Sequence, residues 1–276
     1  MVMSAPAVRA NGETGDAPVA EPLLEACAVT VRFGGLAALN DVSVRVDAGR
    51  TLGIVGPNGA GKTTLFGVLS GLLQPAAGEV FLEGQRVTHL PPQERARRGL
   101  ARTFQRAHLF AELTVREHLE LPYRWLHGRQ SYLRDLVGLG SRAVEDGERE
   151  RVDRLLQNLG LTHVQHQAAN SLPLSTARLV EVGRALAGAP KAVLFDEPSS
   201  GLDSRETEQL ASVLLRACQD EGVALVVVEH DFELVLSLSD RVDVLDFGRL
   251  IASGTPSEIR SDPVVQAAYI GTERLQ

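Results

Sequence analysis

The stretch that decides the fold is "VGPNGAGKTT", residues 55–64. It places Gly56, Gly59 and Gly61 directly before a lysine and two threonines. Glycine loses more chain entropy on folding than any other residue, so this density of glycine needs a physical reason. The pattern Gly-x-x-x-x-Gly-Lys-[Ser/Thr] gives one, because main-chain N–H groups can point at phosphate oxygens only where no Cβ intervenes. The stretch therefore predicts a phosphate-binding loop.

The flanking sequence provides the setting that such a loop requires. "TLGIV" (51–55) predicts a strand, and "KTTLFGVLSGL" (62–72) predicts a helix with an apolar face. The positive end of that helix attracts the same anion. We expect Lys62 to reach the β- and γ-phosphates of a nucleotide and the Thr63 hydroxyl to ligate Mg²⁺. The residues expected to bind the nucleotide are Gly56, Pro57, Asn58, Gly59, Ala60, Gly61, Lys62, Thr63 and Thr64. A glycine-rich turn that carries a lysine by chance is the alternative.

Composition limits the classes of function that remain. The formal net charge of −7 argues against nonspecific nucleic-acid binding, and no nucleic-acid partner is expected. Cys27 and Cys218 form no C-x-x-C pair, which favours a reduced, cytosolic setting. The apolar run Val223–Val228 is far shorter than the roughly 18 residues that cross a bilayer. If the protein serves a membrane, we expect it to be a peripheral subunit.

Periodicity predicts an α/β fold after a disordered N-terminal tail, residues 1–21. Two apolar runs without alternation, "AVLF" and "VALVVV", are interleaved with helical patterns, which is typical of a parallel sheet covered on both faces. A middle block, 106–172, reads as an all-helical subdomain, with one helix from 114 that should end at Pro122 and one that ends at Gly160. The other predicted elements are strands at 24–33, 41–49 and 50–55, a hairpin at 78–87 and a short helix at 91–99.

Acidic and imidazole side chains follow two of the predicted strands. "AVLFDE" ends in Asp196 and Glu197, at the sheet edge where open α/β sheets bind ligands. Asp196 suits a Mg²⁺ shell, and Glu197 could polarise an attacking water. "VVVEH" ends in His230, which we interpret as functional because it follows the adjacent strand. A solvated acidic turn and a structural histidine are the alternatives.

These motifs, in this order, resemble an ABC transporter ATPase over about residues 22–276. The resemblance implies a P-loop NTPase core (22–105 and 173–253), an N-terminal antiparallel β subdomain, the helical subdomain 106–172 and a C-terminal extension, 254–276. It implies ATP and Mg²⁺ as ligands, with Lys62, Gln105, Glu197 and His230 as catalytic residues. It further implies an adenine-stacking role for Phe33, γ-phosphate and Mg²⁺ contacts for Gln105 in "ARTFQ", and a D-loop acid at Asp203 in "SSGLD".

A finer resemblance is to the ATPases of branched-chain amino acid-type importers. "RFGGLAALNDVS", "ARTFQRAHLFAELTVREHL" and "GTPSEIRSDPVVQAAYIG" (254–271) carry it, and the long middle block is similar to the larger of the two ATPases. This implies two permease subunits, a second ATPase, an extracytoplasmic binding protein and a place at the cytoplasmic face of the membrane. An ATPase of another ABC transporter, an exporter included, and a regulatory module with weak turnover are the alternatives. A soluble ABC protein acting on ribosomes or DNA is disfavoured, because the chain has one cassette and no basic arm.

The sequence departs from the family at its signature, LSGGQ in most members. Counting back from "GRALA" without a gap places the motif at "LPLST" (172–176), whereas "LSTAR" (174–178) resembles it by eye. In the ungapped register Pro173 replaces the serine and cannot donate an N–H. Ser175 and Thr176 are then the candidates for contacting a γ-phosphate on the opposite subunit. We hypothesise an asymmetric pair with a different ATPase, in which this signature completes the weaker site; a working homodimer is the alternative.

The aromatic residues of the middle block could serve either packing or binding to a partner. Packing within the helical subdomain is favoured for Tyr123, Trp125 and Tyr132 over a docking surface for the permease.

Overall fold

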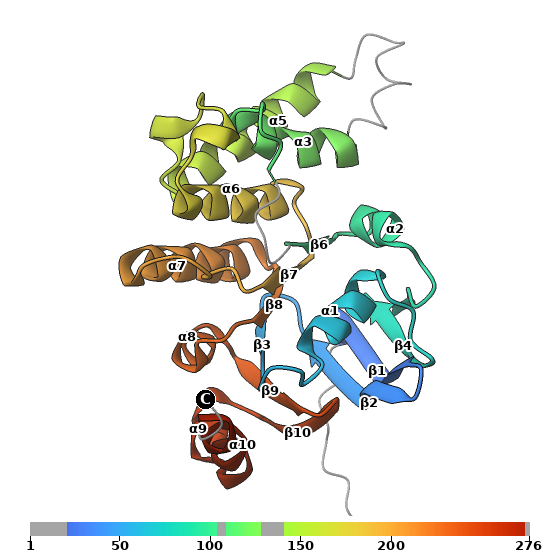
Figure 1. The fold of residues 1–276 in the computed structure, drawn as a ribbon. Helices are drawn as coiled ribbons and strands as arrows, with labels where there is room; N and C mark the ends of the chain where they lie inside the picture. The colour runs from blue at the N-terminus through green and yellow to red at the C-terminus, as the bar shows by residue number, and fades with distance from the viewer. Residues whose placement is uncertain (1–20, 104–108, 128–140, 274–276) are drawn as a thin grey trace, which may run out of the picture.

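The computed structural model describes residues 21–103, 109–127 and 141–273. Almost all of the tail predicted at 1–21, together with Gln105 and Tyr132, lies outside the described residues. The described part contains two β-sheets with helices between and around them (Figure 1). The α/β class predicted from the sequence is confirmed.

The first sheet is antiparallel, with strand order β2-β1-β4-β5. β1 (Leu24–Phe33) matches its predicted range, and β4 (Ala77–Leu82) with β5 (Gln85–Arg86) forms the predicted hairpin. The strand predicted at 41–49 is β2 (Leu36–Val46), which begins five residues earlier. Phe33 pairs with Leu36 across Gly34 and Gly35, so the β1–β2 hairpin includes residues 36–40, which the sequence had not assigned to a strand.

The second sheet has the order β10-β9-β3-β8-β7-β6, and within the described residues its neighbouring strands are parallel except for β10 and β9. β3 (Thr51–Val55), β7 (Ala192–Asp196) and β8 (Ala224–Val228) are buried along their whole length. Their unbroken apolar runs are what a parallel sheet covered on both faces requires. β6 (Leu100–Arg102) lies at one edge, and β9 (Arg241–Asp246) and β10 (Arg249–Gly254) lie at the other.

The parallel register brings the predicted site segments to one edge of the sheet. Asp196 pairs with Val228, and Ile54 pairs with Val228 from the other side. The phosphate loop, the Asp196–Glu197 pair and His230 all follow these three strands directly. The fold therefore gathers side chains that lie far apart in the sequence.

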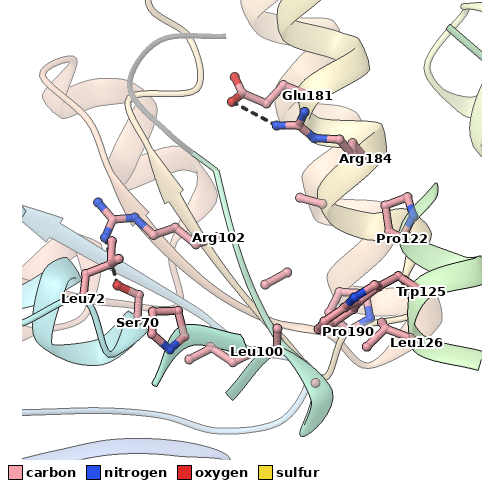
Figure 2. A pocket seen from close by; sticks show the side chains of 16 residues that line it. Ser70, Leu72, Leu100, Arg102, Pro122, Trp125, Leu126, Glu181, Arg184 and Pro190 are labelled. Carbon is pink, nitrogen blue, oxygen red and sulfur yellow. Dashed lines mark hydrogen bonds and ion pairs between the residues drawn. The ribbon is translucent and has the colours of Figure 1, made fainter. Parts of the chain in front are cut away.

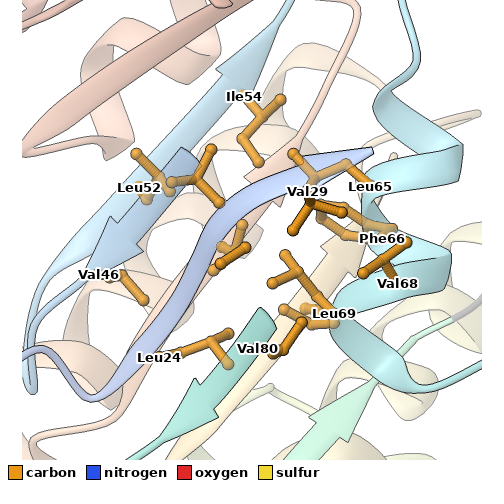
Figure 3. Packing of buried hydrophobic residues seen from close by; sticks show 14 of the residues in the cluster. Leu24, Val29, Val46, Leu52, Ile54, Leu65, Phe66, Val68, Leu69 and Val80 are labelled. Atoms are coloured by element: carbon orange, nitrogen blue, oxygen red, sulfur yellow. The ribbon is translucent and has the colours of Figure 1, made fainter. Parts of the chain in front are cut away.

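One hydrophobic cluster joins the two sheets through helix α1 (Lys62–Ser70) (Figure 3). Leu65, Phe66 and Leu69 of α1 are at most 1% exposed. They pack against side chains of β1, β3 and β4, among them Val29, Ile54 and Val80. This packing fixes the helix that begins at the phosphate loop.

A second cluster lies on the other side of the parallel sheet and reaches the helices of the middle block. α3 (Val115–His127) packs against α5 (Ser141–Asn158) and α6 (Leu174–Ala187), and α7 (Ser204–Glu221) lies between α6 and β8. The prediction that the first of these helices ends at Pro122 is wrong, because α3 runs on to His127. A proline inside a helix removes one hydrogen bond. Pro122 and Leu126 lie against Gly188 at the end of α6, so the helix on both sides of the proline position is packed against a neighbouring element.

Short helices complete the described fold. α2 (Pro92–Arg97) precedes β6, and the 3-10 turns η2 (Thr162–Val164) and η3 (Ala169–Ser171) lead into α6. α8 (Phe232–Leu238), α9 (Pro256–Ser261) and α10 (Pro263–Glu273) lie beside β9 and β10 and share a third small cluster. Among the described helices, none has the length and apolar character needed to span a bilayer.

Candidate active site

The phosphate loop lies between β9 and β2 with no room for side chains at two of its glycines. Gly56 has a φ of 148°, and a Cβ there would stand 2.1 Å from the carbonyl oxygen of Leu245. Gly61 has a φ of 106°, and its Cβ would stand 2.7 Å from the carbonyl oxygen of Ala38. Both positions therefore require glycine for backbone conformation and for close approach.

The first turn of α1 supplies main-chain donors at the end of this loop. Gly61 is the N-cap and makes no side-chain cap hydrogen bond. The N–H groups of Lys62, Thr63 and Thr64 have no acceptor inside the helix, as at every helix start. With the positive end of the helix, they form a cradle suited to phosphate.

Lys62 lies across the loop that precedes it. Its side chain is buried, and Nζ donates to the carbonyl oxygens of Gly56 (2.5 Å) and Pro57 (3.1 Å). Burial lowers the pKa of Lys62, while the charges of Glu197 and Asp196 oppose that shift. The ammonium group is therefore bound to carbonyls of the loop itself and lies within the electrostatic influence of the two carboxylates.

A cavity of ≈ 440 Å³ connects the loop with the ends of β7 and β8. It brings together residues 58–64 with Glu197 and His230, as the sequence predicted. Phe33 is 54% exposed at the β1–β2 hairpin and is not among the described residues that line this cavity; Leu36 and Phe247 are. Phe247 was missed in the sequence, where its signal is an aromatic before the turn glycine in "DFGR".

Glu197 and His230 form a pair at the wall of this cavity. His230 Nε2 lies 2.7 Å from Glu197 Oε1. Glu197 has a φ of 49°, which is unusual for a residue with a Cβ, and its N–H donates to the carbonyl oxygen of Val228. Strained backbone of this kind is held only where the surroundings fix it, and it is concentrated at functional sites.

Asp196 is 5% exposed at the end of β7 and is not among the described residues that line the cavity. Arg102 Nη2 lies 3.2 Å from Asp196 Oδ2. Burial raises the pKa of Asp196, and the positive charge of Arg102 opposes that shift. A carboxylate here and the Thr63 hydroxyl offer the oxygen ligands that Mg²⁺ prefers, so the donor chemistry fits this ion. Gln105, predicted to join them, lies outside the described residues.

Glu229 is a second residue that the sequence reading missed. It is 5% exposed, and its carboxylate accepts the N–H groups of Ser199 (2.7 Å) and of His230 (3.2 Å). Burial raises the pKa of Glu229, and these hydrogen bonds oppose that shift. Glu229 thus ties the start of the D-loop to the backbone of His230. Its signal was an acid inside the buried run "VVVEH", which we read only as strand.

The predicted signature and D-loop residues lie apart from the cavity. α6 begins at Leu174, with Pro173 in extended backbone as its N-cap, so Ser175 and Thr176 stand in the first turn. Asp203 caps α7, with its carboxylate accepting the N–H of Glu206 at 2.8 Å. None of Ser175, Thr176 and Asp203 is among the described residues that line the cavity. Within one chain, the fold does not bring them to the phosphate loop.

A groove of ≈ 350 Å³ opens between α3 and α6 on one side and β6 and α2 on the other (Figure 2). Trp125, Pro122 and Leu126 project into it from α3, and Arg102 borders it from β6. Tyr123 instead reaches α5, where its hydroxyl would stand 2.9 Å from a Cβ at Gly147. The prediction of packing within the helical subdomain therefore holds for Tyr123. It does not hold for Trp125, whose side chain lines the open groove.

Comparison with known proteins agrees with this geometry. The profile of the ABC transporter family matches residues 39–200. The chain belongs to this family. A second profile, of branched-chain amino acid ATP-binding cassette transporters, matches residues 249–274. The fold is that of an ABC ATPase, as the sequence predicted.

Individual relatives of this ABC ATPase align over nearly their whole length. It is 36% identical over 256 residues to the high-affinity branched-chain amino acid transport ATP-binding protein BraF of Pseudomonas aeruginosa, covering 92% of the chain and 99% of the relative. It is 34% identical over 253 residues to LivG of Escherichia coli K12, which carries the same description, with the same coverage. Among solved structures, the ADP conformation of MJ1267, an ATP-binding cassette of an ABC transporter, superposes with a TM-score of 0.75. That structure is 30% identical, and the alignment covers 91% of this chain and 99% of MJ1267.

Proposed function

We propose that the chain is the ATP-hydrolysing subunit of an importer for branched-chain or related amino acids and amides. The observation that carries this proposal is the match of residues 249–274 to the branched-chain cassette profile, because the rest of the fold is common to ABC ATPases. The similarity to BraF and LivG supports it along the remaining length. We assign the chain to the cytoplasmic face of the membrane, as the larger of two ATPases.

In this proposal the described cavity binds the triphosphate of ATP. The N–H groups of Lys62, Thr63 and Thr64 hold the β- and γ-phosphates, and the Lys62 ammonium group neutralises their charge. Thr63 and Asp196, with Gln105, would hold Mg²⁺, and the ion would supply positive charge against the charge that builds up on the transferring phosphoryl group. In this proposal the adenine stacks on Phe33, which pairs with Leu36 in the β1–β2 hairpin. Leu36 and Phe247 line the cavity, whereas Phe33 is not among the described residues that line it.

Hydrolysis is assigned to the pair at the end of β7 and β8. Glu197 orients and polarises the attacking water, and His230 holds the Glu197 carboxylate through the 2.7 Å contact. A carboxylate that is already fixed needs no reorganisation when charge shifts in the transition state. The strained backbone at Glu197 is consistent with a side chain whose direction matters.

A second ATPase subunit completes the site in this proposal. Ser175, Thr176 and Asp203 lie apart from the chain's own cavity, which is what residues acting on the opposite subunit's nucleotide require. The N–H groups at the start of α6 remain available without glycine, but the Pro173 nitrogen carries no hydrogen. We therefore propose an asymmetric pair with a different ATPase, in which this signature serves the weaker site.

The groove beside Trp125 is the proposed contact with the permease. Its lining is mostly apolar, with Leu72, Pro122 and Leu126 among the residues that border it. It lies between the parallel sheet and the helical block, so a permease segment seated there contacts both parts. The extracytoplasmic binding protein belongs to the same system, and no nucleic acid takes part.

The test is reconstitution of the whole system. The full chain is co-expressed with the permease pair and second ATPase of a branched-chain amino acid importer from the same organism. The assembly is purified from membranes and placed in vesicles with the binding protein. We expect co-purification and ATP-dependent uptake of labelled leucine, and no uptake with Glu197→Gln. Outward transport, or uptake confined to a chemically unrelated substrate, would contradict the proposal.

A further inference from the structure

We propose that Arg102 is a positioning residue that orients the Asp196 carboxylate and connects it to the groove beside Trp125. This inference rests on the proposed function, in which Asp196 helps to hold Mg²⁺. It concerns a residue to which the sequence motifs assign no role.

The sheet register places Arg102 next to Asp196. Arg102 ends β6 and pairs in parallel with Leu194 of β7. Asp196 is two residues further along β7, and side chains two residues apart in a strand share a face. The guanidinium group therefore reaches the carboxylate across neighbouring strands, with Nη2 at 3.2 Å from Oδ2. Both side chains are largely buried, at 13% and 6% exposed, so solvent screens the contact only weakly.

Arg102 is also anchored to the helix of the phosphate loop. Its Nη1 donates to Ser70 Oγ at 2.9 Å, and its guanidinium lies 5.8 Å from the centre of the Phe66 ring. Ser70 Oγ in turn donates to the carbonyl oxygen of Phe66 at 2.7 Å. Ser70 is the last residue of α1, and the negative end of a helix attracts a cation. These contacts hold the guanidinium group in place even without its bond to Asp196.

The same side chain borders the groove. Arg102, Ser70 and Trp125 all line it, and Figure 2 shows Arg102 and Ser70 on the wall opposite Trp125. A movement of α3 against β6 changes the walls of this groove, so it reaches Arg102 directly. The structure therefore contains a continuous set of contacts from the groove, through Arg102, to the carboxylate proposed to hold the metal.

The contact uses one carboxylate oxygen of Asp196. Arg102 bonds Oδ2, so the carboxylate can keep this bond while Oδ1 takes a second partner. Hydrogen bonds to a metal-binding carboxylate fix its orientation, and their loss typically costs about 10–100-fold in metal affinity. Because coupling between two sites is reciprocal, a metal ion held at Asp196 also biases the position of Arg102 in the groove.

The experiment uses the full chain and two optical signals. Mg²⁺ is titrated in the presence of a fluorescent ADP analogue, which reports metal-dependent nucleotide binding. Trp125 is the single tryptophan of the chain and lines the groove, so its emission reports the groove. The variants are Arg102→Met, Arg102→Lys and, as the matched control, Arg184→Met, which removes a positive charge from the same groove.

We expect Mg²⁺ with ADP to change Trp125 emission in the unmodified chain. Arg102→Met should raise the Mg²⁺ midpoint by about 10–100-fold and remove the Trp125 response. Arg102→Lys should fall between the two, because lysine keeps the charge and loses the planar fork of donors. Arg184→Met should keep the original midpoint.

Three results would overturn the proposal. One is an unchanged midpoint in Arg102→Met; another is a lower midpoint, which would show that Arg102 only repels the metal. The third is an equal shift in Arg184→Met. If Arg102→Met does not fold, an unchanged midpoint and Trp125 response in Arg102→Lys is decisive against it. Failure of the proposed function is distinguishable, because the unmodified chain would then show no Mg²⁺-dependent nucleotide binding.

Discussion

His230 Nε2 lies 2.7 Å from Glu197 Oε1, although the two residues are 33 positions apart in the chain (230 − 197). They meet because β7 and β8 are adjacent parallel strands, and each residue follows the end of its own strand. Glu229 adds a second tie, since its carboxylate accepts the N–H groups of Ser199 and His230. The catalytic assignment rests on this small set of contacts.

Replacement of Glu197 by glutamine should separate binding from hydrolysis. The amide keeps the size of the side chain but cannot accept a proton from water. We expect ATP turnover to fall at least about 10²-fold, the scale of losing one group that acts in the transition state. Nucleotide affinity, measured by calorimetry, should stay near that of the unmodified chain. Normal turnover would reject the role of Glu197.

A double-mutant cycle tests whether His230 acts through Glu197. Residues that work as a unit give strongly non-additive losses. We therefore expect His230→Ala to slow turnover, and to add little further loss when Glu197 is already glutamine. His163→Ala, at an exposed position on the helical block, is the control and should leave turnover unchanged. Losses that multiply in the double variant would show that the two residues act separately.

The altered signature predicts unequal sites. Pro173, at the N-cap of α6, offers no N–H to a facing phosphate, so the site completed by this chain should be the slower one. We expect low turnover from the chain alone and higher turnover per site after mixing with the second ATPase. Steady-state hydrolysis at matched site concentrations measures this. Equal turnover per site in both samples would contradict asymmetry.

Arg95 should be a main determinant of stability at the C-terminal end of α1. It is fully buried and donates to the carbonyl oxygens of Val68, Leu69, Thr88 and Leu90 at 2.6–3.1 Å. Burial lowers the pKa of Arg95 to about 10. We expect Arg95→Met to reduce the free energy of unfolding by about 3 kcal/mol, because carbonyls at the end of α1 lose their donors. Arg97→Met is the neighbouring control.

Arg97 forms an exposed ion pair with Glu94, and its guanidinium lies 5.5 Å from the centre of the Trp125 ring. Both contacts are at the surface, so the loss of Arg97 should cost only about 1 kcal/mol. Chemical denaturation measures the free energy of unfolding of both variants. Equal effects from Arg95→Met and Arg97→Met would show that burial of the guanidinium contributes nothing.

His118 should make stability depend on pH. Its Nε2 accepts the N–H of Phe110 at 2.9 Å, and its Nδ1 donates to the carbonyl oxygen of Thr114 at 2.8 Å. Burial lowers the pKa of His118 and Arg184 adds to that shift, while the Thr114 hydrogen bond and Glu117 oppose it. The folded state therefore favours the neutral ring, and stability is full above the unfolded pKa of about 6.5.

Stability should fall as the pH drops below that value towards the lowered pKa of the folded state. We expect the unmodified chain to lose about 1 kcal/mol more than His118→Asn between pH 7.5 and 5.5. Denaturant titrations at the two pH values measure the difference, with His163→Asn as an exposed control. An identical pH dependence in His118→Asn would contradict the assignment.

Most of the fold could be predicted because the signals are local. The continuous apolar runs of β7 and β8 give buried parallel strands, and the glycines at 56 and 61 fix the loop between β3 and α1. The sequence prediction ended α3 at Pro122 because a proline usually interrupts a helix. The packing of Pro122 and Leu126 against Gly188 joins segments far apart in the sequence, so it could not be foreseen. The order of the strands within each sheet could not be predicted from the sequence for the same reason, because it depends on pairing between distant segments.

Site residues could be predicted where a short sequence motif contains the groups that a nucleotide site needs. The loop, Glu197 and His230 share one cavity, as expected. Arg102, Glu229 and Phe247 were missed because their environments depend on which strands and turns become neighbours. Asp203 illustrates a further difficulty, since the same carboxylate that matches a D-loop acid also caps α7.

The most direct measurement is calorimetry of the full chain with a non-hydrolysable ATP analogue, with and without Mg²⁺, before and after Lys62→Met. Lys191→Met, an exposed ion-pair partner of Glu83, is the control for loss of one positive charge. The account predicts Mg²⁺-dependent binding that weakens at least about tenfold in Lys62→Met, since a hydrogen bond to a charged group contributes about 1.5–3 kcal/mol. Binding that needs no Mg²⁺, or that survives the loss of Lys62 unchanged, would contradict it.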